Sequence, residues 1–258
     1  DFIPPMEAGL DTPPYAEFIN IPVISPDGSI FEMENAVAIY EVSDGMLWRH
    51  YNYPCGDIEV DPLIGRSGRN LVIQTIPVIG NYDYAVYYIF KQTGEMTIKI
   101  RATGQMSCIG TEITHIGDSH HGDLAGTLVR ERVNAVNHRH HVCIRLDMMV
   151  DGLKTRIYEK EIEIPEISKE NPCGNVFKEV ETLLTKEKKA VRDHDFNKGR
   201  KWMVESSCSK NYLGYHRGIE IVPSPSVIPA SRNCGRIEKR ATFMQHNFFA
   251  TRYHDGEH

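Results

Sequence analysis

Short runs rich in Val, Ile, Tyr and Phe recur along the chain at intervals of about ten residues, with Gly, Pro, Asp and Asn between them. This spacing is typical of an antiparallel all-β domain, in which each run is a strand and each polar interval is a turn. The clearest hairpin joins Tyr84–Lys91 to Met96–Arg101, and Gly94 lies in the turn between them. A second turn is predicted at Pro26, Asp27 and Gly28. We therefore predict a chain that consists mostly of β-strands.

One segment has an ambiguous pattern. From Asn175 to Arg192 apolar residues are spaced loosely among Lys and Glu, which fits an α-helix and a long charged strand equally well. No internal repeat, low-complexity tract or Gly/Ser linker divides the chain. We therefore expect residues 1–258 to form a single domain or a part of one.

Apolar and polar side chains alternate from His138 to Met149. One face of the predicted strand carries His138, His140, Val142, Ile144, Leu146 and Met148. Because this face continues as aliphatic residues, we predict that it is buried in a central strand. The two imidazoles would then point into the interior together, about 6.5–7 Å apart along the chain. Neutral ring nitrogens in this arrangement can bind one metal ion.

A His-x-His sequence is a weak signal by itself, because a chain with 12 histidines often contains one by composition alone. The expected burial strengthens the metal interpretation, since two buried imidazoles need polar partners. A cupin-type iron or manganese site also begins with His-x-His on a strand, but it adds a carboxylate a few residues later. Here no Glu follows, and Asp147 lies on the opposite face of the strand. A cupin-like dioxygenase is therefore disfavoured.

The charge and the cysteine content of the chain limit which partners and which kinds of site are expected. The 258 residues include 29 basic and 35 acidic side chains, with a net charge of -6 and no long run of one sign. Nucleic acid is therefore not an expected partner. No run of about 18 apolar residues is present, so no membrane span is expected. The six cysteines include no close pair, which indicates neither a zinc knuckle nor a dense disulfide framework.

Gly80, Asn81, Tyr82, Asp83 and Tyr84 open an aromatic run, and composition alone predicts an edge strand after an Asn-containing turn. The same five residues resemble the quinone-forming motif of copper amine oxidases. Further segments resemble motifs of that family in the same order: Leu10–Pro14, Leu47–His50, Gly126–Val129, Val136–His140, Arg145–Gly152, Gly199–Trp202 and Lys239–Phe243. The resemblance covers nearly the whole chain, with about 55 residues between the tyrosine and the histidine pair as in the family.

The resemblance implies a fold and a chemistry. The fold would be a mainly β, antiparallel, supersandwich-like β-sandwich. Tyr82 would be the precursor of topaquinone, and His138 and His140 would be two of three copper ligands. Such enzymes use dioxygen to convert primary amines to aldehydes, ammonia and hydrogen peroxide, and full-length members are expected to be homodimers. The amine forms a Schiff base with the quinone; Asn81 would orient it or else serve only the turn, and Asp83 flanks the quinone.

The resemblance also implies that residues 1–258 are part of the family's catalytic domain, truncated at both ends. The third copper histidine of the family lies downstream of Lys239–Phe243, and His246 is not at its position. The proton-abstracting aspartate belongs about twenty residues upstream of the motif at Leu10–Pro14, and Asp1 is too close to it. Because the reaction needs both the full ligand set and the base, we expect these 258 residues alone to be inactive.

Two substitutions fall at motif positions. Val78 occupies a position four residues before Tyr82 where the family commonly has threonine. After the histidine pair the family often supplies Asp-x-Asp to a peripheral calcium or manganese ion, whereas this chain retains Asp147 and has Met149 in place of the second acid. Divalent cations need several oxygen ligands, so we do not expect this peripheral site to be filled.

A further departure concerns the compartment. The resemblance places a common disulfide at two positions that here are Thr12 and Ala38. Loss of both cysteines, together with the absence of an Asn-x-Ser/Thr sequon, favours a non-secreted compartment, peroxisomal or cytoplasmic. The alternative to an enzyme is a non-catalytic β-sandwich relic of the same family. Val78 and Met149 favour the relic, and the intact Tyr82 motif favours the enzyme.

Overall fold

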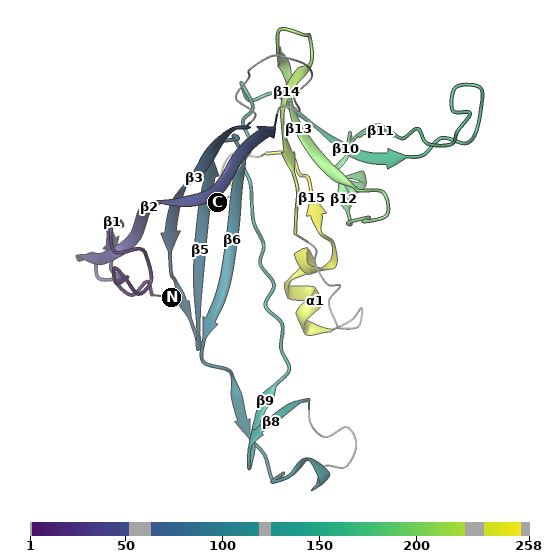
Figure 1. Cartoon of the computed structure of the whole chain (residues 1–258). Coiled ribbons are helices and arrows are strands. Elements are labelled where there is room, and N and C mark those ends of the chain that lie inside the picture. The colour runs from purple at the N-terminus through teal and green to yellow at the C-terminus, as the bar shows by residue number, and fades with distance from the viewer. Residues whose placement is uncertain (1, 52–62, 119–124, 225–234, 254–258) are drawn as a thin grey trace. The chain divides into compact units, whose positions relative to one another are not determined.

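The computed structural model describes residues 2–51, 63–118, 125–224 and 235–253. Its paired strands are antiparallel throughout these residues, and its helices are short (Figure 1). The prediction of a mainly antiparallel β chain is confirmed. The chain divides into two compact units, Asp1–His138 and Arg139–His258.

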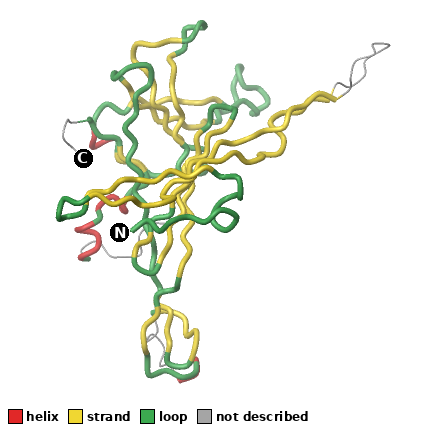
Figure 2. Tube along the Cα trace, turned by 90° about the vertical axis from the view of Figure 1, so that its left-hand side faces the viewer, coloured by secondary structure: helices red, strands yellow, loops and turns green. Residues whose placement is uncertain are grey.

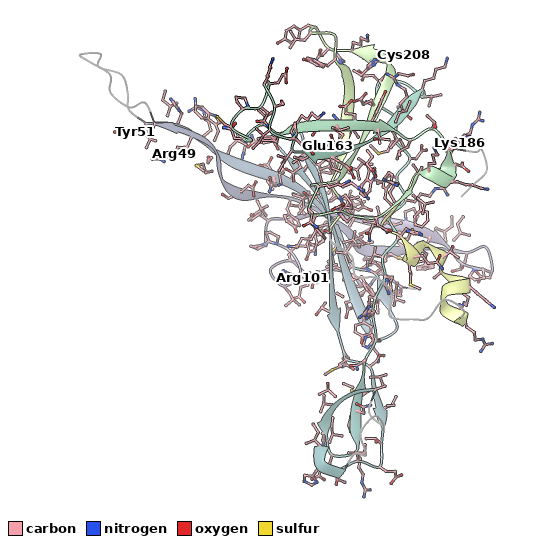
Figure 3. The ribbon with its side chains drawn as sticks, turned by 90° about the vertical axis from the view of Figure 1, so that its right-hand side faces the viewer. Arg49, Tyr51, Arg101, Glu163, Lys186 and Cys208 are labelled. Atoms are coloured by element: carbon pink, nitrogen blue, oxygen red, sulfur yellow. The ribbon has the colours of Figure 1, made fainter. Side chains whose placement is uncertain are left out.

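A large antiparallel sheet dominates the first unit. Its strands are β1 (Glu17–Ile24), β2 (Ile30–Tyr51), β3 (Leu63–Thr75), β4 (Val78–Ile79), β5 (Tyr82–Lys91) and β6 (Met96–Gly104). Their order is β1-β2-β3-β5-β4, in which β3 and β4 pair with different stretches of β5. β6 pairs with β5 along its opposite edge. β2 and β3 form a long hairpin whose far part carries Arg49 and Tyr51 (Figure 3). Strand β5 is therefore paired on both sides.

Both predicted turns are present. Gly28 lies between β1 and β2 with a φ of 84°, and Gly94 lies between β5 and β6 with a φ of 86°. Left-handed φ values of this kind favour glycine, because in this conformation a Cβ atom comes too close to the carbonyl oxygen that follows it in the same chain segment. The predicted pairing of Tyr84–Lys91 with Met96–Arg101 is confirmed, and the register between β5 and β6 is unbroken along its length.

A buried glutamine ties an N-terminal segment to the large sheet. Gln74 is 1% exposed, and its Oε1 accepts a hydrogen bond of 2.6 Å from the Tyr40 hydroxyl. Burial raises the pKa of Tyr40 to about 12, so the phenol remains a neutral donor. The Gln74 Nε2 donates to the Asp11 carbonyl at 3.1 Å. Both the oxygen and the nitrogen of the Gln74 amide therefore have hydrogen-bond partners, one in β2 and one in the N-terminal segment.

This amide lies between the two segments that a disulfide joins in the family that the chain resembles, at the positions that here are Thr12 and Ala38. Thr12 and Ala38 are both buried. Ala38 is paired with Gln74 in the β2–β3 ladder, and Gln74 donates to the residue immediately before Thr12. The hydrogen bond from Gln74 therefore connects the same two segments without a covalent bond.

A small sheet completes the first unit. It consists of β7 (Cys108–Gly110), β8 (Gly126–Arg130) and β9 (Val133–Val136) in the order β7-β9-β8, and η1 (Ile116–Asp118) follows β7 in the chain. The chain passes from the end of β6 to β7 over a few residues (Figure 1). It leaves β9 just before His138. The end of β6 and His138 are therefore both attached to this small sheet.

The second unit contains two sheets, whose strands Figure 2 draws in yellow. β10 (Thr155–Glu163), β11 (Lys178–Leu183), β13 (Lys201–Lys210) and β14 (His216–Ile221) have the order β11-β10-β13-β14. β12 (Val191–Arg192) pairs with β15 (Phe248–Phe249), and the helical turns are η2 (Glu187–Lys189), α1 (Arg236–Arg240) and η3 (Thr242–Gln245). The ambiguous segment Asn175–Arg192 therefore forms two strands and a 3-10 turn, and its α-helical alternative is wrong.

The core of the second unit surrounds Trp202. Its ring is fully buried and stacks on Phe248 with ring centroids 4.3 Å apart. Its Nε1–H donates to Glu159 at 3.2 Å, and the Arg192 Nε donates to the same carboxylate at 2.7 Å. Glu159 is 3% exposed. Because a buried carboxylate is costly without partners, this charge depends on the donors around it.

The predicted central strand from His138 to Met149 is wrong. The structure gives this segment no strand pairing, and Val142, Ile144 and Leu146 are 53%, 49% and 42% exposed. Alternation determines which side chains share a face, but a strand also needs a neighbour whose N–H and C=O groups pair with its own. Within the described residues no such neighbour pairs with this segment.

The described cysteines carry free thiols at exposed positions: Cys108, Cys143, Cys173 and Cys208. Cys55 and Cys234 lie outside the described residues. Among the helices of the described ranges, none has the length and apolar character needed to cross a membrane.

Replacing Gln74 with Leu should lower the free energy of unfolding by about 1–3 kcal/mol, because the Tyr40 hydroxyl and the Asp11 carbonyl would lose a buried partner. Chemical denaturation of the chain measures the loss. Gln92 is the matched control, since its hydrogen bond to the Arg69 N–H is exposed and Gln92→Leu should cost no more than about 0.5 kcal/mol. Equal losses in the two variants would contradict the role of Gln74.

Replacing Glu159 with Leu should destabilise the second unit by about 3 kcal/mol, because Arg192 and the Trp202 indole would lose their shared acceptor. Glu163 lies near the end of the same strand (Figure 3), and its ion pair with Lys178 is exposed. Glu163→Leu should therefore cost less than about 1 kcal/mol. Unfolding monitored by tryptophan fluorescence distinguishes the two, and a Glu159→Leu protein as stable as the control would exclude this role.

Candidate active site around Tyr82

Tyr82 is the first residue of β5 and follows a tight turn. Gly80 has a φ of 63°, and Asn81 is exposed between it and the strand. Tyr82 pairs with Ile79 of β4 on one side and with Gly104 of β6 on the other. The tyrosine is half-buried. Its backbone is thus held between two neighbouring strands.

The Tyr82 hydroxyl contacts two groups of the first unit. Its Oη lies 2.6 Å from the His138 Nε2 and 3.2 Å from the Ser107 backbone nitrogen, which donates to it. The two rings are tilted by 46° with centroids 5.5 Å apart. The structure therefore brings together two residues that are 56 positions apart in the chain.

A backbone carbonyl determines which nitrogen of His138 carries a proton. The Nδ1 lies 2.8 Å from the Val136 carbonyl oxygen. Because a carbonyl can only accept, Nδ1 must hold the proton in the neutral ring, which leaves a lone pair on Nε2. Nε2 then accepts the hydrogen of the Tyr82 hydroxyl. The phenol therefore donates to the histidine and accepts from Ser107.

The remaining predicted site residues lie in varied environments. Asp83 is half-buried in β5, between Val78 of β4 and Thr103 of β6 in the ladder. His140 and Asp147 belong to the second unit and are exposed. His138 is also exposed, so the prediction that the histidine pair faces a buried interior is wrong. The expected burial followed from a strand that does not form.

The donor chemistry at His138 fits a metal ligand. Imidazole is a good ligand for copper, and metal-binding histidines usually donate their other ring N–H to a carbonyl or carboxylate, as His138 does to Val136. Within the described ranges, however, no group of three or more His, Cys, Asp or Glu side chains could hold a metal ion. These residues therefore fit part of a copper ligand set, and no peripheral cation site is assigned to Asp147.

The sequence interpretation missed three residues around the tyrosine. Ser107 and Val136 act through backbone atoms, which have no signature in the sequence. Gly104 pairs with Tyr82 and has a φ of 106°. A glycine three residues beyond the predicted strand Met96–Arg101, at the end of the hairpin that carries Tyr82, was a signal for close backbone approach.

Comparison with known proteins shows which protein family has a similar sequence. The family model "Copper amine oxidase, enzyme domain" matches residues 2–258. The copper-containing diamine oxidase 1, peroxisomal, of Nicotiana tabacum is 30% identical over 98% of this chain and 31% of its own length. The primary amine oxidase of Arthrobacter sp. strain P1 is 31% identical over 89% of this chain and 34% of its own. The chain thus spans about a third of the length of these relatives.

The fold comparison agrees. The crystal structure of a copper-containing benzylamine oxidase from Hansenula polymorpha superposes with a TM-score of 0.82 and 24% sequence identity. The match covers 94% of this chain and 36% of the solved one. The fold of the chain is therefore that of the corresponding part of this oxidase.

Nitrogen NMR of the histidine rings should find His138 as the Nδ1–H tautomer, with a protonated Nδ1 and an unprotonated Nε2, because the Val136 carbonyl accepts only from a protonated nitrogen. A His138→Gln variant assigns the signals. Tyr82→Phe is the control, since it removes the phenol and leaves the carbonyl, and it should retain the same tautomer. Observation of the Nε2–H tautomer would contradict this geometry.

Proposed function

Because this chain belongs to the copper amine oxidase family, we propose that the protein oxidises primary amines to aldehydes with dioxygen and water, releasing ammonia and hydrogen peroxide. Tyr82 is the proposed precursor of topaquinone, and His138 and His140 are proposed as two copper ligands. The observation that carries this proposal is the 2.6 Å contact between the Tyr82 Oη and the His138 Nε2. Oxidation of a tyrosine by a bound metal requires near contact of this kind.

The residues of the chain have distinct proposed roles. Copper, when bound, would supply with dioxygen the oxidation of the Tyr82 ring, and the resulting quinone would be the electron acceptor for the amine. The Nε2 lone pair of His138 can serve either the Tyr82 hydroxyl or a metal, so the phenol oxygen lies beside the atom that would bind copper. Asn81, the exposed residue before Tyr82, is proposed to orient the amine, and Asp83 is the next residue of the β5 ladder after Tyr82.

The described residues support only part of the catalytic apparatus. They contain no group of three metal-binding side chains, and a pair of histidines binds copper less tightly than a complete set. We therefore propose that residues 1–258 form one part of the enzyme domain and do not make the quinone alone. A homodimer is the proposed assembly, and the amine substrate is assigned only as a class.

The substitution at Thr12 and Ala38 supports a non-secreted compartment, cytoplasmic or peroxisomal. The Gln74 hydrogen bond connects the segments without a disulfide, and the described cysteines are free. Relatives from Nicotiana tabacum and Arabidopsis thaliana carry the word peroxisomal in their names. These observations favour the peroxisome among reducing compartments.

A non-catalytic relic of the family is the second candidate. It is favoured by Val78, which replaces a polar residue and pairs directly with Asp83 in the ladder. It is also favoured by the absence of a three-ligand group among the described residues. The enzyme interpretation explains the contact between Tyr82 and His138, which a relic has no physical reason to keep.

The native protein, including any residues beyond 1–258, should develop visible quinone absorption when copper and dioxygen are added to its metal-free form, and phenylhydrazine should give a coloured adduct. Residues 1–258 alone should give neither. Tyr82→Phe should abolish the adduct and retain copper. Tyr84→Phe is the matched control, because its ring lies next to that of Tyr82 at a centroid distance of 6.4 Å. If the unmodified native protein gives no adduct, the interpretation as a non-catalytic relic would replace the interpretation as an enzyme.

A further inference from the structure

Four hydrogen bonds of the first unit close into a ring around the candidate site. The Tyr82 hydroxyl donates to the His138 Nε2, and the His138 Nδ1–H donates to the Val136 carbonyl. The Val136 N–H donates to the Ser107 carbonyl at 3.3 Å, and the Ser107 N–H donates back to the Tyr82 Oη at 3.2 Å. This hydrogen-bond ring joins the large sheet to the small sheet through the two proposed functional side chains.

Gly104 determines how the chain enters this ring. It is the last residue of β6 and pairs with Tyr82, three positions before Ser107. A Cβ atom at this position would lie 2.9 Å from the Tyr82 Cα and the Asp83 Oδ2 and closer still to the Asn81 carbonyl oxygen. Two of these atoms belong to the backbone of the tyrosine motif, so they cannot move away as a flexible side chain can.

The backbone after Gly104 bends toward the tyrosine. The φ of Gly104 is 106°, which side chains rarely allow. The next residue, Gln105, donates its N–H to the Asn81 carbonyl at 2.8 Å. That hydrogen bond fixes the direction of the chain and brings the Ser107 N–H to the hydroxyl of Tyr82.

We propose that Gly104 is a positioning residue for the oxidation of Tyr82: its missing side chain and left-handed backbone place the Ser107 N–H against the phenol, which closes the hydrogen-bond ring and aims the hydroxyl at the His138 Nε2. The proposal rests on the proposed function, in which Tyr82 is the cofactor precursor. Without the Ser107 N–H the Tyr82 side chain could rotate about its side-chain bonds and move the hydroxyl away from the His138 Nε2. A misplacement of about 1 Å can lower a reaction rate about 100-fold.

Gly104→Ala in the native protein should slow quinone formation about 100-fold after addition of copper and dioxygen. Copper uptake, followed by electron paramagnetic resonance, should be unchanged, because the Val136 carbonyl still orients His138. Gly94→Ala is the matched control. Gly94 lies at the other end of the same hairpin with a φ of 86°, but a Cβ atom there would meet nothing within 4 Å. It carries similar backbone strain without the clash, so it should form quinone at the normal rate.

A second readout does not depend on the enzyme reaction. In metal-free native protein labelled with 3-fluorotyrosine, the Tyr82 fluorine resonance, assigned with Tyr82→Phe, should move in Gly104→Ala and stay in place in Gly94→Ala. Ser107→Pro, which lacks the N–H, should move the same resonance, whereas Ser107→Ala keeps the backbone donor and should not. This pair decides the question if Gly104→Ala does not fold.

The outcomes separate the two proposals. Equal quinone rates and unmoved resonances in Gly104→Ala and Gly94→Ala would overturn the positioning role, and so would equal resonances in the two Ser107 variants. If the unmodified protein forms no quinone but the resonance moves as expected, the proposed function fails and the hydrogen-bond ring remains supported. A parallel loss of copper uptake in Gly104→Ala would indicate a general structural defect and would also overturn the role.

Discussion

The unbroken register between β5 and β6 is the constraint on which the candidate site depends. It places Tyr82 opposite Gly104 at one end of the hairpin, while Gly94 closes the other end. A shift of one residue would turn the tyrosine ring to the opposite face of the sheet, because side chains alternate along a strand. The same shift would bring a side chain to the position that Gly104 leaves open. The turn, the ladder and the glycine therefore act together on one phenol.

His138 is brought to the site by the order in which the strands follow one another in the chain. β6 leads into the small sheet, whose strand β9 ends two residues before His138. The Val136 carbonyl at the end of β9 selects the tautomer of the histidine, so secondary structure determines which ring nitrogen is available. The site thus depends on strand ends, where backbone groups are not used up by a ladder and can contact side chains. Such positions allow a sheet protein to orient reactive groups.

The extent to which the sequence predicted the structure depended on how local each feature is. The β5–β6 hairpin was predictable because Gly94 and the alternation on either side carry the information within a short window. The proximity of Tyr82 and His138 followed only from the family resemblance, since pattern alone relates no two distant residues. The strand at His138–Met149 was wrongly predicted because alternation says nothing about a pairing partner. The backbone N–H of Ser107 could not be predicted as a donor, because every residue except proline has one.

Ser107 and Val136 enter the hydrogen-bond ring through their backbone atoms alone. Any substitution except proline keeps these backbone atoms, so other side-chain changes at these two positions would leave the arrangement intact in diverging descendants. At Gly104 the freedom is absent, because even a methyl group meets the backbone of the tyrosine motif. Besides the Tyr82 and His138 side chains of the ring, natural selection for the geometry would therefore leave its trace at this glycine. Variation at positions 107 and 136 in distant relatives would be no argument that the geometry had been lost.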